Sequence, residues 1–352
     1  MDQVRRGASG GEGPGSFPLL TEGKRGTKSP SGPPAAVDTF GFSFDVDEVN
    51  YEGGQVFFSG YNSPDEVMTC RQALPGGGFV STSDARRGNG YVRAWVEASM
   101  PKRVLDSNVE ALGVDEALEA GREAFREATY FVRPVMGQHF ENSGIVRLDG
   151  VRDFDGVASV NELLNGLAAA PRLSRLKVRR FQDPARSAAE SLRVGPKAWN
   201  GQLYDKHAET NGEAEEGRLR SEFRMHLDQL TNERAKREGF MMRRVCDVTE
   251  EKVQRLTRST FQLCAFDREV VGKASMSEKV FGCSWLSTKE QAGLWAYLTA
   301  PTFAKRFDRK TLRKYRRFAE QLGVTMAAAD EEMPDVRVAL DFDSGTEVVR
   351  VA

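Results

Sequence analysis

Five polar residues fall at positions where they could share one face of a β-sheet: Glu97, Asp149, Tyr204, Lys206 and Glu222. They lie in four segments, "YVRAWVEA", "VRLDGV", "GQLYDKH" and "RLRSEFRMH", that alternate polar and apolar residues. Side chains alternate across a strand, so residues two apart point to the same side. The alternation predicts strands with one face packed on a core and one open face that carries charge.

These residue types suit chemistry at a phosphodiester. Carboxylates held close together repel, and a divalent cation commonly keeps them in place. All-oxygen ligands favour Mg²⁺ or Mn²⁺ over zinc, and such an ion can neutralise charge that develops at phosphorus. A tyrosine beside it is suited to nucleophilic attack. A nearby lysine such as Lys206 would either lower the pKa of the Tyr204 phenol or stabilise the pentacovalent transition state.

An ordinary solvated sheet face is the alternative interpretation. Cross-strand ion pairs are common on such faces and contribute only a few tenths to about 1 kcal/mol. Asp149 would then pair with Arg147, and Tyr204 would be one more strand aromatic. The spacing within one sequence leaves both interpretations open.

The chain has 352 residues, of which 50 are basic and 51 are acidic. A nucleic-acid-binding protein of this balance must gather its positive charge in patches. Two segments offer such patches, "RLSRLKVRRF" (172–181) and "KRFDRKTLRKYRR" (305–317). A solvated helix face is the alternative for the second. The residues predicted to contact DNA here are Arg179, Arg180, Lys310, Arg313, Lys314, Arg316 and Arg317.

The amino-acid composition also indicates the cellular compartment in which the protein is expected. The four cysteines form no Cys-x-x-Cys pair, which argues against a zinc cluster or a disulfide framework and favours reduced thiols. The N-terminus lacks the apolar run of a signal peptide, and no stretch of about 18 apolar residues suggests a membrane span. We therefore expect a cytoplasmic location without membrane association.

The sequence divides into three parts. Residues 1–36 are rich in Gly, Pro and Ser and are expected to form a disordered basic tail. Residues 37–230 alternate strand and helix patterns, with strands expected at 54–60, 90–99, 144–151, 200–209 and 218–227 and helices within 113–132 and 154–170. This pattern predicts an α+β fold, a mostly antiparallel sheet with helices on one face.

Residues 231–352 are predicted to form a mainly helical accessory region that binds DNA and ends in a strand pair. Thr249 is a predicted N-cap, and Ser287 with Glu290 has the pattern of a capping box. Apolar residues of 302–324 fall near one stripe of a helix, and Trp285 is expected to be a packing residue. The end of the chain, "DVRVALDFDSGTEVVRVA", predicts a hairpin that turns at "DSG".

An ordered series of motifs over residues 90–325 resembles the gene II replication initiators of filamentous phages, part of the wider group of tyrosine nicking enzymes. "VEASMPKRVLDSNVEALG" resembles that family's strand with its Ala-Ser-Pro-Lys turn, and "VRLDGV" resembles its Arg-Ile-Asp strand. "LYDKHAE" is similar to its catalytic tyrosine segment, and "RLRSEFRM" to its Val-Arg-Phe-Glu-Ala-Arg strand. "RKTLRKYRRFAEQLGV" is similar to a basic, aromatic helix near its C-terminus.

The resemblance implies a nicking-endonuclease-like fold and assigns roles. Tyr204 would be the nucleophile, assisted by Lys206. Asp149 and Glu222 would hold Mg²⁺ or Mn²⁺, and Glu97 falls where the family also has an acidic residue. The wider group usually carries a His-hydrophobe-His metal motif, which His139, His207 and His226 do not form. The arginines expected to contact DNA beside this site are Arg147, Arg220 and Arg224.

The implied activity is a metal-dependent nicking and closing of one strand at a double-strand origin, through a 5′-phosphotyrosyl intermediate. Its partners would be origin duplex, single-stranded DNA, and the host's helicase and polymerase, in the cytoplasm of the host. A non-catalytic DNA-binding regulator of replication or copy number is the main alternative. A polymerase or primase palm is another, and it would require nucleoside triphosphates and leave Tyr204 dispensable.

Overall fold

The computed structural model describes residues 35–351, apart from 51–54, 60–66, 84–90, 159, 170–175, 183–189, 197–198, 272, 300–306 and 327–335. The expected tail, residues 1–36, lies outside the described residues except for Ala35 and Ala36. Gly32–Ala352 form one compact unit.

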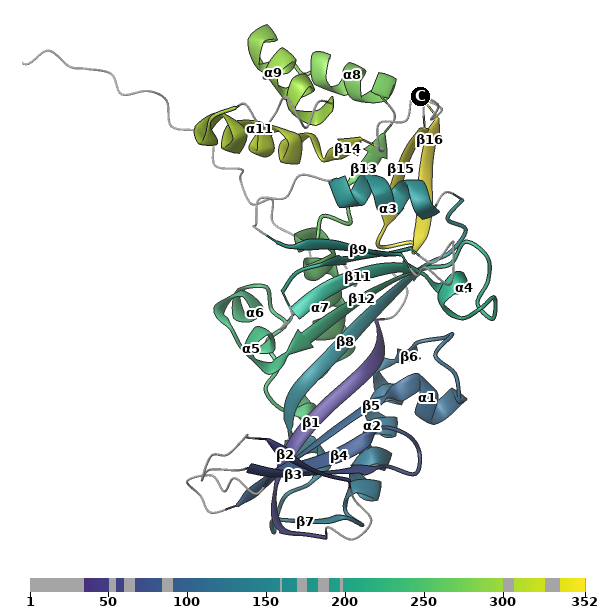
Figure 1. Ribbon diagram of the computed structural model, residues 1–352, viewed down its shortest axis with the longest axis vertical. Helices are drawn as coiled ribbons and strands as arrows, with labels where there is room; N and C mark the ends of the chain where they lie inside the picture. Colours follow the sequence, from purple (N-terminus) through teal and green to yellow (C-terminus); the bar gives the residue numbers. More distant parts are fainter. Residues whose placement is uncertain are drawn as a thin grey trace, which may run out of the picture. The chain divides into compact units, whose positions relative to one another are not determined.

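A twelve-stranded sheet dominates this unit, and its strand pairs are antiparallel (Figure 1). Its strand order is β2-β3-β4-β5-β1-β8-β12-β11-β10-β9, and β6 and β7 also pair with β1. The strands are β1 Ala36–Val49, β2 Gln55–Ser59, β3 Val67–Ala73, β4 Phe79–Ser83, β5 Val92–Ser99, β6 Leu112–Gly113, β7 Val132–Pro134, β8 Gly144–Phe154, β9 Val178–Gln182, β10 Glu190–Val194, β11 Trp199–Asp205 and β12 Leu219–His226.

The five strands expected from alternation are present as β2, β5, β8, β11 and β12. The strand expected over 200–209 ends earlier, because a short helix begins at Lys206. The strand at the middle of the sheet, β1, is not among those expected. Its side chains Phe40, Phe42, Phe44 and Val46 are two residues apart and buried, so they supply the core face of that strand.

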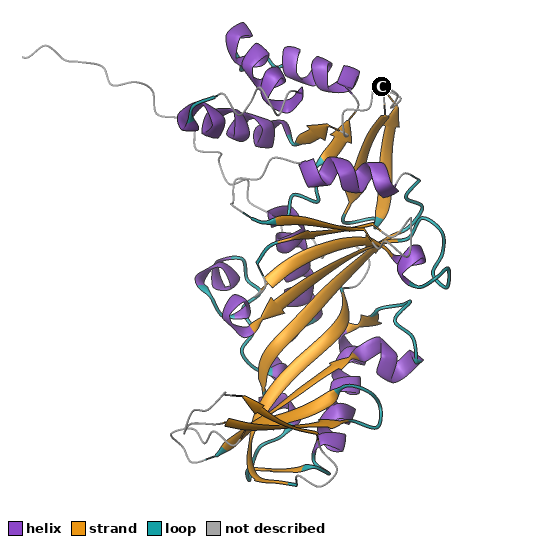
Figure 2. Cartoon of the chain, in the orientation of Figure 1, coloured by secondary structure: helices purple, strands orange, loops and turns teal. Residues whose placement is uncertain are grey.

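Three helices cover one face of the sheet (Figure 2). Helix α2 (Val114–Ala128) packs on β1 and β5, α7 (Glu250–Leu263) on β8 and β12, and α3 (Val160–Ala169) on β9, β10 and β11. The apolar side chains of the strands and helices meet in two buried clusters. The predicted class, α+β with a mostly antiparallel sheet and helices on one face, is confirmed.

A glycine lets α7 lie close to the strand that carries Asp149. A Cβ atom at Gly150 would lie 2.7 Å from Thr257 Oγ1, so a larger residue would push the helix away. Gly150 points to the helix side of β8, and its neighbour Asp149 therefore points to the opposite side. Tight packing behind β8 thus fixes the strand that presents the carboxylate.

The C-terminal region holds helices and a four-stranded sheet of order β14-β13-β15-β16. The expected boundary near residue 230 would cut through a buried cluster, since Phe240, Met242 and Val253 pack with Phe42. The remaining elements are α1 Met100–Leu105, α4 Lys206–Glu209, α5 Leu227–Leu230, α6 Glu233–Arg237, α8 Lys273–Phe281, α9 Thr288–Thr299, α11 Arg309–Leu322, β13 Glu269–Val271, β14 Val324–Met326, β15 Val336–Asp341 and β16 Thr346–Val351, with 3₁₀ turns at Phe140–Asn142 and Val245–Asp247.

Several local predictions for this region are confirmed. Thr249 caps α7 by accepting a hydrogen bond from Lys252 N at 3.3 Å. Glu290 Oε2 accepts one from Ser287 N at 3.0 Å. Strands β15 and β16 pair antiparallel, with residues 342–345 as their turn. Among the described helices, none is both long and apolar enough to cross a membrane.

Candidate active site

The register of β8, β12 and β11 brings the expected site residues to the sheet face opposite the three helices. Arg224 of β12 lies directly opposite Asp149 of β8. Tyr204 of β11 lies opposite Arg220 of β12. Glu222 stands between the two arginines on β12 and shares their face. We call this surface, made by Glu97, Arg147, Asp149, Tyr204, Glu222 and Arg224, the polar face.

Asp149 is fully buried and is held by two arginines. Arg147 Nε donates to its Oδ1 at 2.9 Å, and Arg147 Nη2 donates to its Oδ2. Arg224 Nε approaches Oδ2 at 3.3 Å. Burial on its own would lower the pKa of Arg147, but the hydrogen bonds and charge of Asp149, with the charge of Glu97, outweigh it and raise that pKa. The guanidinium of Arg147 therefore stays charged.

Glu97 reaches the same cluster across a strand. Its carboxylate accepts a hydrogen bond from Arg147 Nη1, although β1 lies between their strands. On β1, Gly41 pairs with Glu97 on one side and with Arg147 on the other. A Cβ atom at Gly41 would lie 3.1 Å from Arg147 Cβ, so the glycine leaves room for the guanidinium to cross β1.

Glu222 is the most perturbed carboxyl of the polar face. Burial and the negative charge of Asp149 raise its pKa to about 7. Arg224 opposes this shift, with its Nη2 at 3.4 Å from Glu222 Oε1. The other carboxylate oxygen, Oε2, lies 3.5 Å from Tyr204 Oη. A carboxyl that titrates near neutral pH and faces a phenol is suited to take the proton of that phenol.

The surroundings of Tyr204 raise the pKa of its phenol. Burial is the largest cause, and the charge of Glu222 adds to it, while Arg220 opposes it. The net shift is therefore upward, opposite in direction to the lowering expected from Lys206. A phenol in this environment stays protonated until a base removes its proton during the reaction.

Lys206 also differs from its expected place on the strand. It is the first residue of α4 and is fully buried, with Nζ 2.8 Å from Glu209 Oε2 and 5.8 Å from the centroid of the Tyr204 ring. Burial and the charge of Arg220 lower its pKa. Its amino group therefore packs beside the tyrosine ring, where it pairs with Glu209.

Arg220 was expected to contact DNA, and the structure contradicts this. Its side chain is completely buried and forms two hydrogen bonds of 2.6 Å to the Asp153 carboxylate. It also donates to Asn108 O at 2.9 Å and to Val109 O at 2.6 Å. Arg220 therefore ties the segment after α1 to the sheet, because alternation puts it on the polar face beneath that segment.

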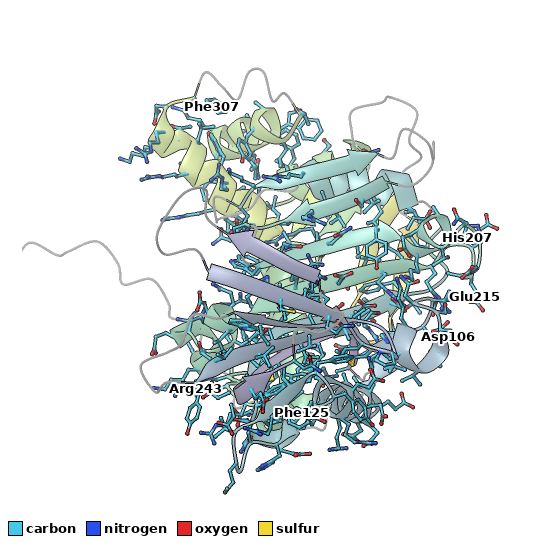
Figure 3. The ribbon with its side chains drawn as sticks, turned by 60° about the horizontal axis from the view of Figure 1, so that its bottom comes forward. Asp106, Phe125, His207, Glu215, Arg243 and Phe307 are labelled. Atoms are coloured by element: carbon cyan, nitrogen blue, oxygen red, sulfur yellow. The ribbon has the colours of Figure 1, made fainter. Side chains whose placement is uncertain are left out.

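The same segment is held at a second point, by Arg218. Its guanidinium bonds Glu110 and lies 2.9 Å from Asp155 Oδ1 and 3.6 Å from Glu215 Oε2. Figure 3 shows Asp106, at the end of α1, on the same edge as Glu215. The residues after α1 thus border the Tyr204 end of the polar face.

Asp38 is a site residue that the sequence reasoning missed. It lies in an irregular stretch of β1, where the pairing with β8 shifts between Val37 and Phe40. Its negative charge helps to raise the pKa of both Glu222 and Tyr204. No signal in the sequence marks it, because strand alternation does not carry through the irregularity.

The metal expected at Asp149, Glu222 and Glu97 does not fit their observed arrangement. Arg147 and Arg224 occupy the oxygens of Asp149, and Glu222 faces Arg224 and Tyr204. Within the described part of the chain, no three His, Cys, Asp or Glu side chains are grouped so that they could hold a metal ion. Arginine guanidinium groups supply the positive charge that the carboxylates need.

The other basic residues lie on separate elements. Arg179 is exposed on β9, two strands beyond β11, and the side chain of Arg180 lies outside the described residues. The five expected on the C-terminal helix are on α11, which packs against α9 and β14. Lys310, Arg313, Lys314 and Arg317 are exposed there, whereas Arg316 is half-buried.

No family model and no curated protein matches the chain. Among solved structures, it is similar to a chain titled "Structure of Rolling Circle Replication Initiator Protein from Geobacillus stearothermophilus". That similarity has a TM-score of 0.31 and 14% identity, and it covers 56% of this chain and 75% of the other.

Proposed function

We propose that the chain nicks one DNA strand at a replication origin and so initiates rolling-circle replication, with Tyr204 as nucleophile and Glu222 as its base. The observation that carries the proposal is the 3.5 Å contact between Tyr204 Oη and Glu222 Oε2. The contact lies on a face with two arginines, Arg147 and Arg224. The motif order that resembles the gene II initiators supports the same assignment of Tyr204.

In the forward step, Tyr204 Oη attacks a phosphodiester phosphorus while its proton passes to the Glu222 carboxylate. The bond between phosphorus and the 3′ oxygen breaks, and that oxygen takes a proton from solvent. The products are a free 3′-hydroxyl and a 5′-phosphotyrosyl link to the protein. A positioned base of this kind contributes about 10²–10⁴-fold in rate.

Closing reverses these steps. A 3′-hydroxyl attacks the phosphorus of the link and gives its proton to solvent. The bond to Tyr204 Oη breaks, and Glu222 returns its proton to the phenol. The phosphotyrosyl link conserves the energy of the phosphodiester bond that was broken, so joining requires no ATP. Because Glu222 titrates near neutral pH, it can serve as base in one direction and as acid in the other.

Arg224 is the phosphate contact that we assign on the polar face. Its side chain is 32% exposed, against 13% for Arg147. Guanidinium groups bind phosphate oxygens in a bidentate manner and stabilise charge as it develops. Arg147 instead holds Asp149 and Glu97, and we assign it a positioning role.

The remaining partners follow from the same proposal. Arg179 on β9 and the exposed basic residues of α11 would contact the phosphates of origin DNA. The free 3′-hydroxyl would prime a host polymerase, with a host helicase to open the duplex, in the host cytoplasm. The resemblance implies Mg²⁺ or Mn²⁺, whereas the observed arrangement of Asp149, Glu222 and Glu97 does not fit such an ion. An assay with and without EDTA decides between the two.

The experiment uses single-stranded oligonucleotides of random sequence with a 3′ fluorophore. Cleavage leaves the labelled downstream fragment on the protein, so a fluorescent band that survives denaturant reports the covalent link. Tyr204→Phe should abolish this band. Tyr130→Phe is the matched control, since Tyr130 is 77% exposed and lies after α2, and it should retain the band.

The alternatives give different results in the same assay. A non-catalytic regulator would bind DNA without any adduct, in the wild-type chain as well as in the variant. A polymerase or primase palm would form a product only with nucleoside triphosphates. An adduct that persists in Tyr204→Phe would remove Tyr204 from the mechanism.

A further inference from the structure

Two aromatic side chains lie half in solvent in the helical part of the C-terminal region, and one of them, Trp285, contacts the basic helix α11. Phe281, the last residue of α8, is 47% exposed, and Trp285, between α8 and α9, is 50% exposed. Trp285 was expected to be a packing residue; one part of its ring packs on Phe318 of α11, and half of the side chain remains exposed. Exposed apolar surface that is rimmed by polar residues commonly marks a binding site.

Both rings are held in place by packing. Trp285 contacts Phe318 of α11 edge to face, with ring centroids 5.4 Å apart. Phe281 lies 5.8 Å from Trp295 of α9. Gln291 Nε2 also donates to the main-chain oxygen of Phe281 at 3.2 Å. The exposed ring faces are therefore fixed before any ligand arrives, which reduces the entropy cost of binding.

Positive charge lies on α11, the helix that Trp285 contacts through Phe318. Helix α11, "RKTLRKYRRFAEQL", has six basic residues and one acidic residue over about 21 Å. Lys314 Nζ lies 5.5 Å from the centroid of the Phe318 ring, which also contacts Trp285. Residues three or four apart share a helix face, so Lys310, Lys314 and Arg317 form one row next to the aromatic contact.

We propose that Phe281, Trp285 and the basic row of α11 bind single-stranded nucleic acid. Unpaired bases would stack on the Trp285 indole, and the phosphates between them would contact Lys310 and Arg317. Stacking platforms beside a basic groove bind single strands in a sequence-tolerant way. In a duplex the base faces are hidden in the stack, so a duplex would use the basic row without the rings.

This proposal depends on the proposed function in one respect: the single strand that binds would be the one displaced at a nicked origin. Binding itself does not need Tyr204 chemistry. The test therefore uses the full-length Tyr204→Phe protein, which should bind as the wild-type chain does. A chain that binds single strands but forms no adduct would sustain this inference while removing the nicking proposal.

The experiment measures fluorescence anisotropy of a labelled oligothymidylate of about 16 nucleotides and of a duplex of the same length. Trp285→Ala should weaken binding of the single strand about 5- to 100-fold and leave duplex binding within about twofold. Trp285→Phe should retain most of the affinity, because a ring remains for stacking. Tyr130→Ala is the matched exposed aromatic and should change neither affinity.

Charge is tested separately. Arg317→Glu should weaken binding of both single strand and duplex, whereas Arg237→Glu, on α6 with a 76% exposed side chain, should not. In the wild-type chain, unlabelled oligothymidylate should quench tryptophan fluorescence, which reports on Trp285 itself. The extent of this quenching should decrease in Trp285→Phe. Equal loss for single strand and duplex in Trp285→Ala, or no loss in either, would overturn the proposal.

Discussion

Glu222 and Asp149 lie on adjacent strands of the same face, and the charge of Asp149 adds to burial in raising the pKa of Glu222 to about 7. Asp149 is fully buried and is held in place by Arg147 and Arg224. Two carboxyls in one site thus have separate tasks. Asp149 anchors the arginines, and Glu222 is free to exchange a proton with Tyr204.

Replacing the base should slow nicking without weakening DNA binding. Glu222→Gln keeps the size of the side chain but cannot accept the phenol proton. The rate of adduct formation should fall about 10²–10⁴-fold. In the wild-type chain the rate should rise as pH increases through about 7, as Glu222 ionises. Single-turnover rates from pH 5 to 9 measure both effects.

Glu215→Gln is the matched control for that experiment. Glu215 is 80% exposed at the same edge of the sheet and lies 3.6 Å from Arg218. Its rate and pH profile should equal those of the wild-type chain. If Glu222→Gln keeps the rise near pH 7, another group provides the base.

Glu222 should also make folding stability depend on pH. Its pKa is raised in the folded state from about 4.5, so its favourable contribution is full below about pH 4.5 and is lost as pH rises through about 7. Asp149 and Asp38 disfavour its charged form, and Arg224 favours it. Glu222→Gln should remove a loss of roughly 2 kcal/mol between pH 5 and 8. Urea unfolding at pH 5 and pH 8 measures this loss of stability. An equal loss in Glu222→Gln would mean that another group causes the pH dependence.

The buried ion pair below the segment after α1 should be important for stability. Arg220→Met leaves Asp153 without its partner and frees the carbonyls of Asn108 and Val109. Removing one member of a buried pair costs about 3–5 kcal/mol. Arg133→Met is the control, because Arg133 pairs with Glu48 at an exposed position. Denaturant midpoints should separate the two variants, and equal midpoints would mean that the pair is not structural.

Alternation within short segments predicted much of this architecture. It identified β5, β8, β11 and β12 and placed Glu97, Asp149, Tyr204 and Glu222 on one face. Local capping patterns predicted the starts of α7 and α9. These features depend on neighbours within a few residues, which a sequence displays directly.

What the sequence could not predict depends on contacts between distant segments. Arg220 and Arg224 point to the same face of β12. The segment after α1 nevertheless buries Arg220, whereas the side chain of Arg224 is 32% exposed. Asp38 enters the site through an irregular pairing of β1. The contacts of Arg147 and Arg224 with Asp149 also depend on which side chains reach it from its own and neighbouring strands.

That arrangement predicts how the site responds to divalent cations. Arg224→Gln removes positive charge shared by Asp149 and Glu222, so Mn²⁺ should bind the variant better than the wild-type chain. The thermal midpoint of the variant should rise by about 1–2 °C per kcal/mol of binding energy when Mn²⁺ is added. Arg93→Gln, beside the single carboxylate of Asp45 at 3.1 Å, is the control. Equal responses in all three proteins would show that arginine does not compete with a cation.

Charge reversal on α11 should separate DNA binding from cleavage. Arg313 is exposed, whereas its neighbour Lys314 is 2.6 Å from Glu290, so Arg313→Glu is the cleaner change. Binding of duplex DNA should weaken, and the slope of log affinity against log salt should become shallower by about 1 for the lost phosphate contact. Cleavage of short oligonucleotides at saturating protein should stay within about twofold, since Tyr204 and Glu222 are on other elements. Arg237→Glu carries the same charge change on α6 and should leave the salt slope unaltered; an unchanged slope in Arg313→Glu as well would remove α11 from the DNA contacts.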